Sequence, residues 1–514
     1  MDSLVDTGPA PACPAPFNLA AHVLAAGRRV PGKPALEVLH ADGAEMWTHG
    51  DLARRVAAAA ARLGAEGLAP GDRLLMRIGD APEFPVVFLA AVQAGILPVP
   101  TSAALTAPEV ATIVRDIAPA AIAAADAVTL PAAAPCPVLR SADLAAPPAD
   151  SAPVAPAPHM GDPARPAFIV YTSGTSGAPR AVVHAHRAIW ARGMMTEGWY
   201  GLRGDDRLLH AGAFNWTFTL GTGLLDPWTA GATALIPAPG TDAAALPGLL
   251  AAHGATIFAA APGIHRRVLR AEMPALPALR HGLSAGERLS PALRTRWRAA
   301  TGTDLHEAFG MSECSTFLSG SPARPAPDGA TGFAQPGRRI ALLDDAGGPV
   351  PRGMPGLIAV AATDPGLMLG YLGQAEETRA RYTADGAWFL TGDIGAMDAT
   401  GAITHLGRGD DMMNAGGVRV SPVEVEAAFL AHPAITDAAA VERPVASGAT
   451  VIALHYVADG DLSDADLAAF AADRLARYKC PRIFVRETAL PRGANNKLSR
   501  RTLRARAEQE RTPP

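Results

Sequence analysis

Apolar residues along the chain occur either at helical spacing or in short continuous runs. Residues 51–65, DLARRVAAAAARLGA, combine helical spacing with charges on one side, and short apolar runs with the character of strands follow, such as PVVFL at 85–89. Helix-like and strand-like segments alternate through much of the chain. This alternation predicts an α/β fold of layered sheets and helices, and not a helical bundle or a β-sandwich.

The pattern changes in the last quarter of the chain. Residues 386–411 read as strands and turns, and the region after residue 407 predicts a strand, a helix (422–432), two strands (438–442 and 451–457) and a second helix (464–476). We therefore predict a large N-terminal domain over 1–409 and a small α+β C-terminal domain over 410–514. A Pro/Ala-rich stretch over 131–166 predicts a surface loop inside the large domain, with an interdomain linker as the alternative.

Composition narrows the class of protein. Of 514 residues, 49% are hydrophobic and 18% charged, and the net charge is −4, so no strongly basic face is expected and nucleic acid is not predicted as a partner. No apolar run approaches the ~20 residues of a membrane helix, and the acidic, proline-broken beginning shows no secretion signal. Four widely separated cysteines indicate a reducing compartment. These features predict a cytoplasmic protein without membrane insertion.

A loop rich in glycine and hydroxyl residues follows the predicted buried strand AFIVY at 167–171. Backbone N–H groups at glycines, hydroxyl donors and a terminal cation together suit a phosphate cradle. The loop lacks the GxxxxGK[ST] pattern, and a polar surface loop without a ligand is the alternative. The candidate phosphate-binding residues are Thr172, Ser173, Gly174, Thr175, Ser176, Gly177 and Arg180.

Six ordered motifs connect this loop to a known group of proteins. YTSGTSGAPRAVVHAH is followed by SAGE at 284–287, EAFGMSE at 307–313, TGD at 391–393, GRGDD at 407–411 and PRGANNK ending at residue 497. The set resembles the adenylate-forming (AMP-binding) superfamily, in particular its acyl-CoA synthetases and benzoate-CoA ligases, over about residues 17–505. The resemblance implies the adenylate-forming fold, in which the small C-terminal domain is mobile and carries a catalytic lysine.

The resemblance also implies a reaction and its cofactors. A carboxylate attacks the α-phosphate of ATP, pyrophosphate leaves, and the thiol of coenzyme A then attacks the acyl-adenylate. Because the first step brings two anions together, it requires a metal ion and fixed cations. Glu313 matches the residue that helps to hold Mg²⁺, and Lys497 matches the catalytic cation; an exposed glutamate and a surface lysine are the alternatives. The implied nucleotide contacts, besides the loop, are Ser284, Ala285, Gly286, Glu307, Ala308, Phe309, Gly310, Ser312, Asp393 and Arg408.

The remaining implied roles concern the acid, the thiol and the hinge. Aromatic residues followed by glycines after the phosphate loop match the acid-binding wall, with core packing as the alternative for Phe218. Gly416 and Gly417 match the channel for the pantetheine arm, and Asp410 matches the hinge, with turn residues as the alternative for each. The candidate acid-pocket residues are Asn215, Trp216, Phe218 and Gly221.

Two departures from the family pattern keep other functions open. Arg180 stands where lysine is usual, and Phe309 where tyrosine is usual. Only three lysines, Lys33, Lys479 and Lys497, occur beside 42 arginines, so retention of a compact cation at 497 favours the catalytic role. We predict an ATP-dependent acyl-CoA ligase for a small aromatic or short-to-medium-chain carboxylic acid. The alternatives are a stand-alone adenylation enzyme that loads a carrier protein and a catalytically decayed nucleotide- or acyl-binding relative. A homodimer is an open expectation.

Overall fold

A computed structural model describes residues 1–148, 156–172, 180–415, 418–444, 450–492 and 498–509. Its central sheet has the strand order β16-β15-β14-β13-β12-β10-β11-β2-β3, with parallel neighbours from β14 to β2. In that order the strands span Phe333–Ala334, Ser315–Ser319, Asp304–Met311, His281–Ala285, Ile257–Ala260, Arg207–His210, Thr233–Pro237, Pro34–His40 and Gly43–Thr48. Parallel strands alternating with helices confirm the predicted α/β class.

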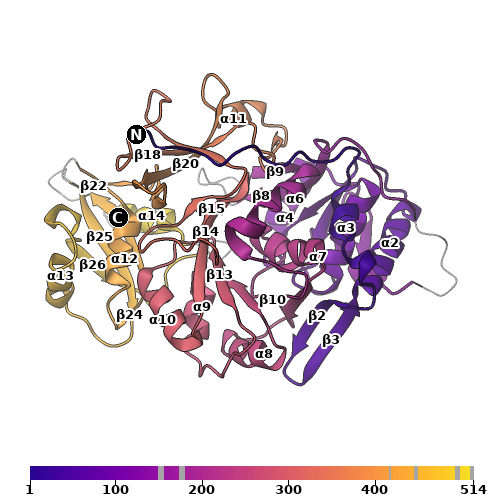
Figure 1. The fold of residues 1–514 in the computed structure, drawn as a ribbon, viewed down its shortest axis with the longest axis horizontal. Coiled ribbons are helices and arrows are strands. Elements are labelled where there is room, and N and C mark those ends of the chain that lie inside the picture. Colours follow the sequence, from indigo (N-terminus) through magenta and orange to yellow (C-terminus); the bar gives the residue numbers. More distant parts are fainter. Residues whose placement is uncertain (149–155, 173–179, 416–417, 445–449, 493–497, 510–514) are drawn as a thin grey trace.

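Three smaller sheets complete the large N-terminal part (Figure 1). The parallel sheet β5-β4-β6-β7 spans Leu97–Pro100, Arg73–Arg77, Ala121–Ala124 and Val138–Arg140. The sheet β19-β9-β8 spans Gly370–Tyr371, Arg180–Ala185 and Pro166–Thr172, and the antiparallel sheet β1-β17-β18-β20-β21 spans Leu4–Asp6, Arg339–Leu343, Pro355–Ala361, Trp388–Met397 and Ile403–Arg408. The predicted strand at 167–171 is therefore β8, and the predicted strands after residue 386 are β20 and β21.

Helices cover the sheets of this part. They are α1 (Leu19–Val23), α2 (His49–Ala65), α3 (Glu83–Ala94), α4 (Ala107–Ile117), α5 (Ser141–Ala145), α6 (Arg187–Arg192), α7 (Asp226–Ala230), α8 (Leu246–Ala252), α9 (Pro262–Val268), α10 (Pro291–Thr301) and α11 (Ala375–Arg379). The predicted helix at 51–65 is α2, which begins with a capping box: Asp51 donates its N–H to Thr48 Oγ1, and Thr48 donates its N–H to the Asp51 carboxylate. Its buried face repeats at helical spacing through Leu52, Val56 and Leu63.

One local prediction was wrong. The apolar run 85–89, interpreted as strand-like, lies inside α3, and every residue from Phe84 to Gln93 is buried. A helix buried on all sides has no polar positions to reveal its period, so the run has the same appearance as a buried strand. The Pro/Ala-rich stretch contains only short described elements, β7 and α5, as its composition predicts.

The C-terminal part forms a separate sheet, β24-β25-β26 (Ile435–Pro444, Thr450–Ala458 and Ile483–Arg486), with α12 (Pro422–Phe429), α13 (Asp464–Ala472) and α14 (Arg500–Gln509). It lies at one end of the molecule beside α9 and α10 (Figure 1). A two-stranded sheet, β22-β23 (Met413–Ala415 and Val418–Val420), follows β21. The boundary near residue 410 stays a prediction. Among the described residues, no helix is long and apolar enough to cross a bilayer.

Candidate functional site

The predicted ribose contacts lie on two adjacent antiparallel strands. Asp393 on β20 and Arg408 on β21 are register partners, and Arg408 Nη1 lies 3.3 Å from Asp393 Oδ2. The other carboxylate oxygen, Oδ1, lies 2.9 Å from Nε2 of His405. The structure thus brings Asp393 and Arg408 together, and the buried carboxylate of Asp393 is held between Arg408 and His405.

His405 connects this corner to the EAFGMSE motif, and sequence reasoning missed it. Its ring stacks on that of Phe309, with centroids 4.5 Å apart and planes 26° apart, while Phe317 meets Phe309 edge-on at 5.4 Å. His405 thus occupies one face of the Phe309 ring, on which the sequence predicts that adenine stacks. The available signal was the position of His405 two residues before Gly407, on the strand that ends in Arg408.

A second missed residue, Tyr371 on β19, joins two predicted ones. Its hydroxyl donates to Glu313 Oε1 at 2.8 Å, and the Arg180 guanidinium carbon lies 5.0 Å above its ring. Burial, reinforced by the Glu313 carboxylate, raises the pKa of Tyr371 to about 12, so the hydroxyl remains a donor at neutral pH. The predicted metal ligand Glu313 and the predicted phosphate-binding cation Arg180 therefore both contact Tyr371, Glu313 at the hydroxyl and Arg180 at the ring face.

Glu313 suits the Mg²⁺ role that the sequence assigns to it. It is buried, and Mg²⁺ in nucleotide sites commonly takes one or two carboxylates together with phosphate oxygens. Among the described residues, no group of three or more His, Cys, Asp or Glu side chains is placed to hold a metal ion without such phosphates. Glu313 would thus hold a nucleotide-bound ion, and the assignment stays a prediction.

Several predicted site residues lie outside the described part of the chain. The hairpin of β8 and β9 is described up to the backbone pair Thr172 and Arg180, which flank the predicted phosphate loop. The residues outside the description are Ser173, Gly174, Thr175, Ser176, Gly177, Gly416, Gly417 and Lys497.

The predicted adenine wall is formed by neighbouring parallel strands, where Ser284 on β13 pairs with Glu307 on β14. Glu307 is buried and both of its carboxylate oxygens are engaged: one accepts the N–H of Leu289 at 3.1 Å, and the other lies 2.8 Å from Arg294 Nη2. In this structure Glu307 therefore holds α10 against the sheet. Burial raises its pKa, an effect that Arg294 opposes. Its predicted nucleotide contact is untested.

The acid wall packs directly against this strand pair. Trp216 and Phe218 meet edge-on at 5.1 Å, and both belong to an apolar cluster that contains Ala285 and Ala308. A β-carbon at Gly286 would lie 2.5 Å from Cη2 of Trp216, so the glycine leaves room for the indole. Phe218 is buried in this cluster, consistent with the core-packing alternative.

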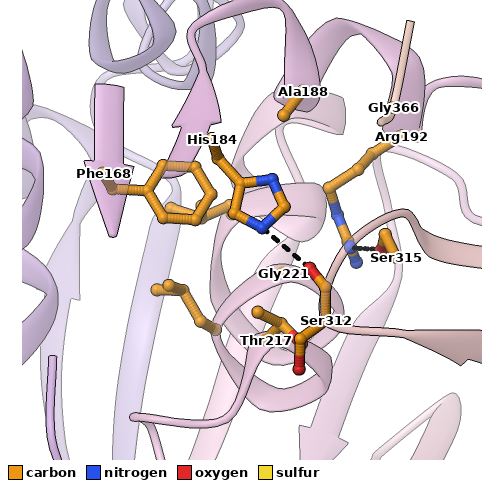
Figure 2. Close-up of a pocket in the computed structure, with 11 residues that line it drawn as sticks. Phe168, His184, Ala188, Arg192, Thr217, Gly221, Ser312, Ser315 and Gly366 are labelled. Carbon is orange, nitrogen blue, oxygen red and sulfur yellow. Dashed lines mark hydrogen bonds between the residues drawn. The ribbon is translucent and has the colours of Figure 1, made fainter. Parts of the chain in front are cut away.

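A cavity of about 40 Å³ lies next to the acid wall (Figure 2). Its lining joins Thr217 and Gly221 from the wall segment to Ser312, from EAFGMSE, and to Ser315. Gly310 lies where the register of the β14–β15 pairing shifts, close to Ser312 in sequence. Asn215 is half-buried and precedes the π-helical segment of the acid wall, Thr219–Leu225. Arg192, which sequence reasoning missed, reaches the cavity from the end of α6.

Charged residues connect the C-terminal part to the SAGE motif. Arg492 Nη1 lies 2.8 Å from Oε1 of Glu287, and Arg492 Nη2 lies 2.5 Å from Oδ2 of Asp437. The predicted hinge residue Asp410 contacts Arg408, with Oδ1 3.3 Å from Nε. Arg492 immediately precedes the residues 493–497, which include Lys497. On the other side of these residues, Leu498 forms a β-bridge with Arg492, so described contacts flank the predicted catalytic lysine on both sides.

Two family models match the chain. The model of the AMP-binding enzyme matches residues 24–372, and that of the AMP-binding enzyme C-terminal domain matches residues 424–497. Benzoate–CoA ligase of Thauera aromatica is 29% identical over 537 residues, covering 97% of this chain and 98% of the relative. 3-Hydroxybenzoate–CoA ligase of Aromatoleum sp. (strain CIB) is 31% identical, covering 90% of this chain and 92% of the relative.

Solved structures give the same result for the fold. An anthranilate CoA ligase in complex with anthranoyl-AMP superposes with a TM-score of 0.87 at 26% identity, over 96% of this chain and 98% of that chain. A benzoate CoA ligase from Burkholderia xenovorans LB400 superposes with a TM-score of 0.83 at 29% identity, over 95% of this chain and 100% of that chain.

Proposed function

The chain belongs to the AMP-binding enzyme family, and from this premise we propose that it is an ATP-dependent acyl-CoA ligase for a small aromatic or short-to-medium-chain carboxylic acid. One observation carries the proposal: three predicted parts of the site are in contact with one another. The acid wall and the EAFGMSE motif line one cavity, and Phe309 of that motif stacks on His405, which contacts Asp393 of the Asp393–Arg408 pair. Such contiguity is what the transfer of a nucleotidyl group to a carboxylate requires.

In the proposed first step, a carboxylate oxygen forms a bond to the α-phosphorus of ATP while the bond to pyrophosphate breaks. Asp393 would accept hydrogen bonds from the ribose hydroxyls, held in position by Arg408 and His405. Arg180, at the end of the phosphate loop, supplies positive charge through a planar fork, which suits spread phosphate oxygens. We assign Lys497 to the reacting oxygens, where a compact charge is needed.

Mg²⁺ belongs to the same proposal, and bound with ATP it would offset the charge of the phosphates. Glu313 would supply the protein ligand, and Tyr371 would hold its carboxylate in position by donating to Oε1. Chelation of divalent ions is expected to abolish pyrophosphate release, and Mg²⁺ is expected to restore it.

In the second step, the thiol of coenzyme A attacks the acyl carbonyl carbon, and AMP leaves with the electron pair of the broken C–O bond. AMP-forming CoA ligases use ATP and CoA, and we extend both to this chain. Location in the cytoplasm and a homodimeric state are retained as parts of the proposal, to be tested by fractionation and light scattering.

The decisive experiment is a panel of carboxylic acids incubated with ATP, Mg²⁺ and CoA, scored separately for pyrophosphate and for thioester. Acid-dependent pyrophosphate together with a CoA thioester is the expected result. Pyrophosphate release with acyl transfer only to an added carrier protein would replace the proposal by the adenylation-enzyme alternative. ATP binding without pyrophosphate release for any acid would indicate the decayed relative.

A further inference from the structure

A buried arginine joins the acid wall to the turn that carries Glu313. Arg192 is the last residue of α6, and its guanidinium pairs with Asp226, with Nη2 2.6 Å from Oδ2 and side chains 10% and 8% exposed. Arg192 Nη2 also donates to Oγ1 of Thr222 at 3.2 Å, within the π-helical segment of the wall. Because Asp226 balances its charge, the guanidinium can remain buried at this place.

Packing and hydrogen bonds together fix this guanidinium relative to the wall. A β-carbon at Gly221 would lie 2.1 Å from Cζ of Arg192, so a side chain at that position would displace the arginine. The hydroxyl of Tyr200 accepts from Arg192 Nη2 at 2.9 Å and donates to Oδ2 of Asp226 at 2.6 Å. Hydrogen bonds that involve a charged group are the stronger ones, so the position of the guanidinium is well determined.

The remaining nitrogen of the guanidinium holds the turn. Arg192 Nη1 donates to the hydroxyl of Ser315, the first residue of β15 (Figure 2). Glu313 lies in the loop 312–314 that joins β14 to this strand, and hairpin loops of this length commonly end on a left-handed residue, usually glycine. Ser315 occupies that place with a φ of +61°, which a residue other than glycine keeps only where its surroundings hold it.

We propose that Arg192 is a positioning residue for the proposed first step: through Ser315 it fixes the turn that carries Glu313 at a set distance from the acid wall. The inference rests on the proposed ligase function and adds to it a residue that acts through another. Glu313 would position Mg²⁺ and the phosphates, whereas the wall would position the carboxylate that attacks them. Since a misplacement of about 1 Å can cost about a hundredfold in rate, loss of this link should lower kcat.

Two variants of Ser315 test whether its hydrogen bond acts through the backbone. Ser315→Ala loses the acceptor for Arg192 while a β-carbon remains in the left-handed conformation, so the turn should relax and kcat for acyl-adenylate formation should fall about tenfold. Ser315→Gly also loses the acceptor, but glycine adopts this conformation readily, so kcat should stay within about threefold of wild type. KM for ATP and for benzoate, the probe acid, should change less than about twofold in both variants. Equal losses of kcat in the two variants, or a loss confined to KM, would overturn the inference.

Arg192→Lys tests the arginine itself. Lysine keeps the charge that balances Asp226, but it lacks the planar fork that reaches Ser315 at the same time, so kcat should fall about tenfold with little change in KM. Arg298→Lys is the matched control and should leave these constants unchanged, because Arg298 is 72% exposed and pairs with Asp304 at the surface. Should Arg192→Lys fail to fold, Ser315→Ala decides the question, since it leaves the buried ion pair intact. A kcat equal to that of wild type in the folded variant would refute the assignment.

A measurement without substrates separates this inference from the ligase function. The N–H of Met368 donates to the carbonyl oxygen of Glu313 at 2.7 Å, so its hydrogen exchange reports on the position of the turn. Exchange of peptides that contain this amide, followed by mass spectrometry on the nucleotide-free protein, should be faster in Ser315→Ala and unchanged in Ser315→Gly. The same exchange in Ser315→Ala as in wild type would overturn the role of Arg192. Failure of every acid to release pyrophosphate would overturn the ligase function, and the exchange comparison would still decide whether Arg192 holds the turn.

Discussion

The ion pair between Arg492 and Glu287 should hold the C-terminal part in the arrangement that forms the acyl-adenylate. Glu287 follows the predicted adenine wall, and Arg492 precedes the residues that contain Lys497, so the contact joins the two halves of the proposed active site. The perturbation is Glu287→Gln, which preserves the shape of the side chain and a hydrogen-bond acceptor while removing the charge.

The magnitude follows from the geometry. The two atoms lie 2.8 Å apart, and the side chains are 20% and 22% exposed, so the pair is partly shielded from water. A pair of this kind contributes about 1 kcal/mol, at the upper end of the range for exposed pairs. Arg266 Nη2, on α9 and 4.0 Å from Oδ1 of Asp437, still joins the large part to the C-terminal part in the variant and limits the loss. A loss of about 1 kcal/mol corresponds to about a fivefold shift in the docking equilibrium.

The assay separates the two half-reactions. Acid-dependent ATP–pyrophosphate exchange should fall about fivefold in Glu287→Gln at low salt, and thioester formation from supplied acyl-adenylate should not fall. Raising the ionic strength should bring the exchange rates of wild type and variant together, because salt screens the pair. Glu272→Gln, at an exposed position, is the charge-matched control. Equal losses in both half-reactions, or an exchange rate insensitive to the variant at low salt, would refute the reasoning.

Three further predictions concern the nucleotide site and stability. Lys497→Ala should reduce the rate of acyl-adenylate formation at least about a hundredfold, because the variant loses a group that stabilises charge in the transition state. Thioester formation from supplied acyl-adenylate should fall far less. An equal loss in both half-reactions would count against the catalytic role of Lys497. Asp393→Asn should raise KM for ATP about tenfold, and an unaltered KM in the folded variant would exclude the ribose contact. The free energy of unfolding should fall as the pH falls from about 6.5 towards 4, because histidines of the unfolded chain bind protons while the buried histidines of the folded protein stay neutral. Each such histidine contributes about 1.4 kcal/mol per pH unit. A denaturation midpoint that does not change between pH 7 and 5 would contradict this prediction. The histidines whose pKa burial lowers to about 3 or 4 are His184, His186, His210, His265, His281 and His306.

The ordered motifs were predictable because they are local. A strand such as β8 is recognised from consecutive apolar residues, and TGD and GRGDD carry their types and spacing within a few positions. The register that pairs Asp393 with Arg408 was not predictable in this way, since it depends on how β20 and β21 align. Single histidines and tyrosines such as His405 and Tyr371 have no local pattern, and their roles arise only from long-range contacts.

The sequence by itself determined the α/β class, the order of the motifs, the family resemblance and the retention of a lysine at 497 in an arginine-rich chain. These properties depend on residue type, period and spacing along one dimension. Only the tertiary structure decided that Gly221 makes room for Arg192, that Glu307 holds α10, and that His405 stacks on Phe309. Contacts of this kind depend on which distant segments meet in the fold, so no local pattern of residue types along the chain could indicate them.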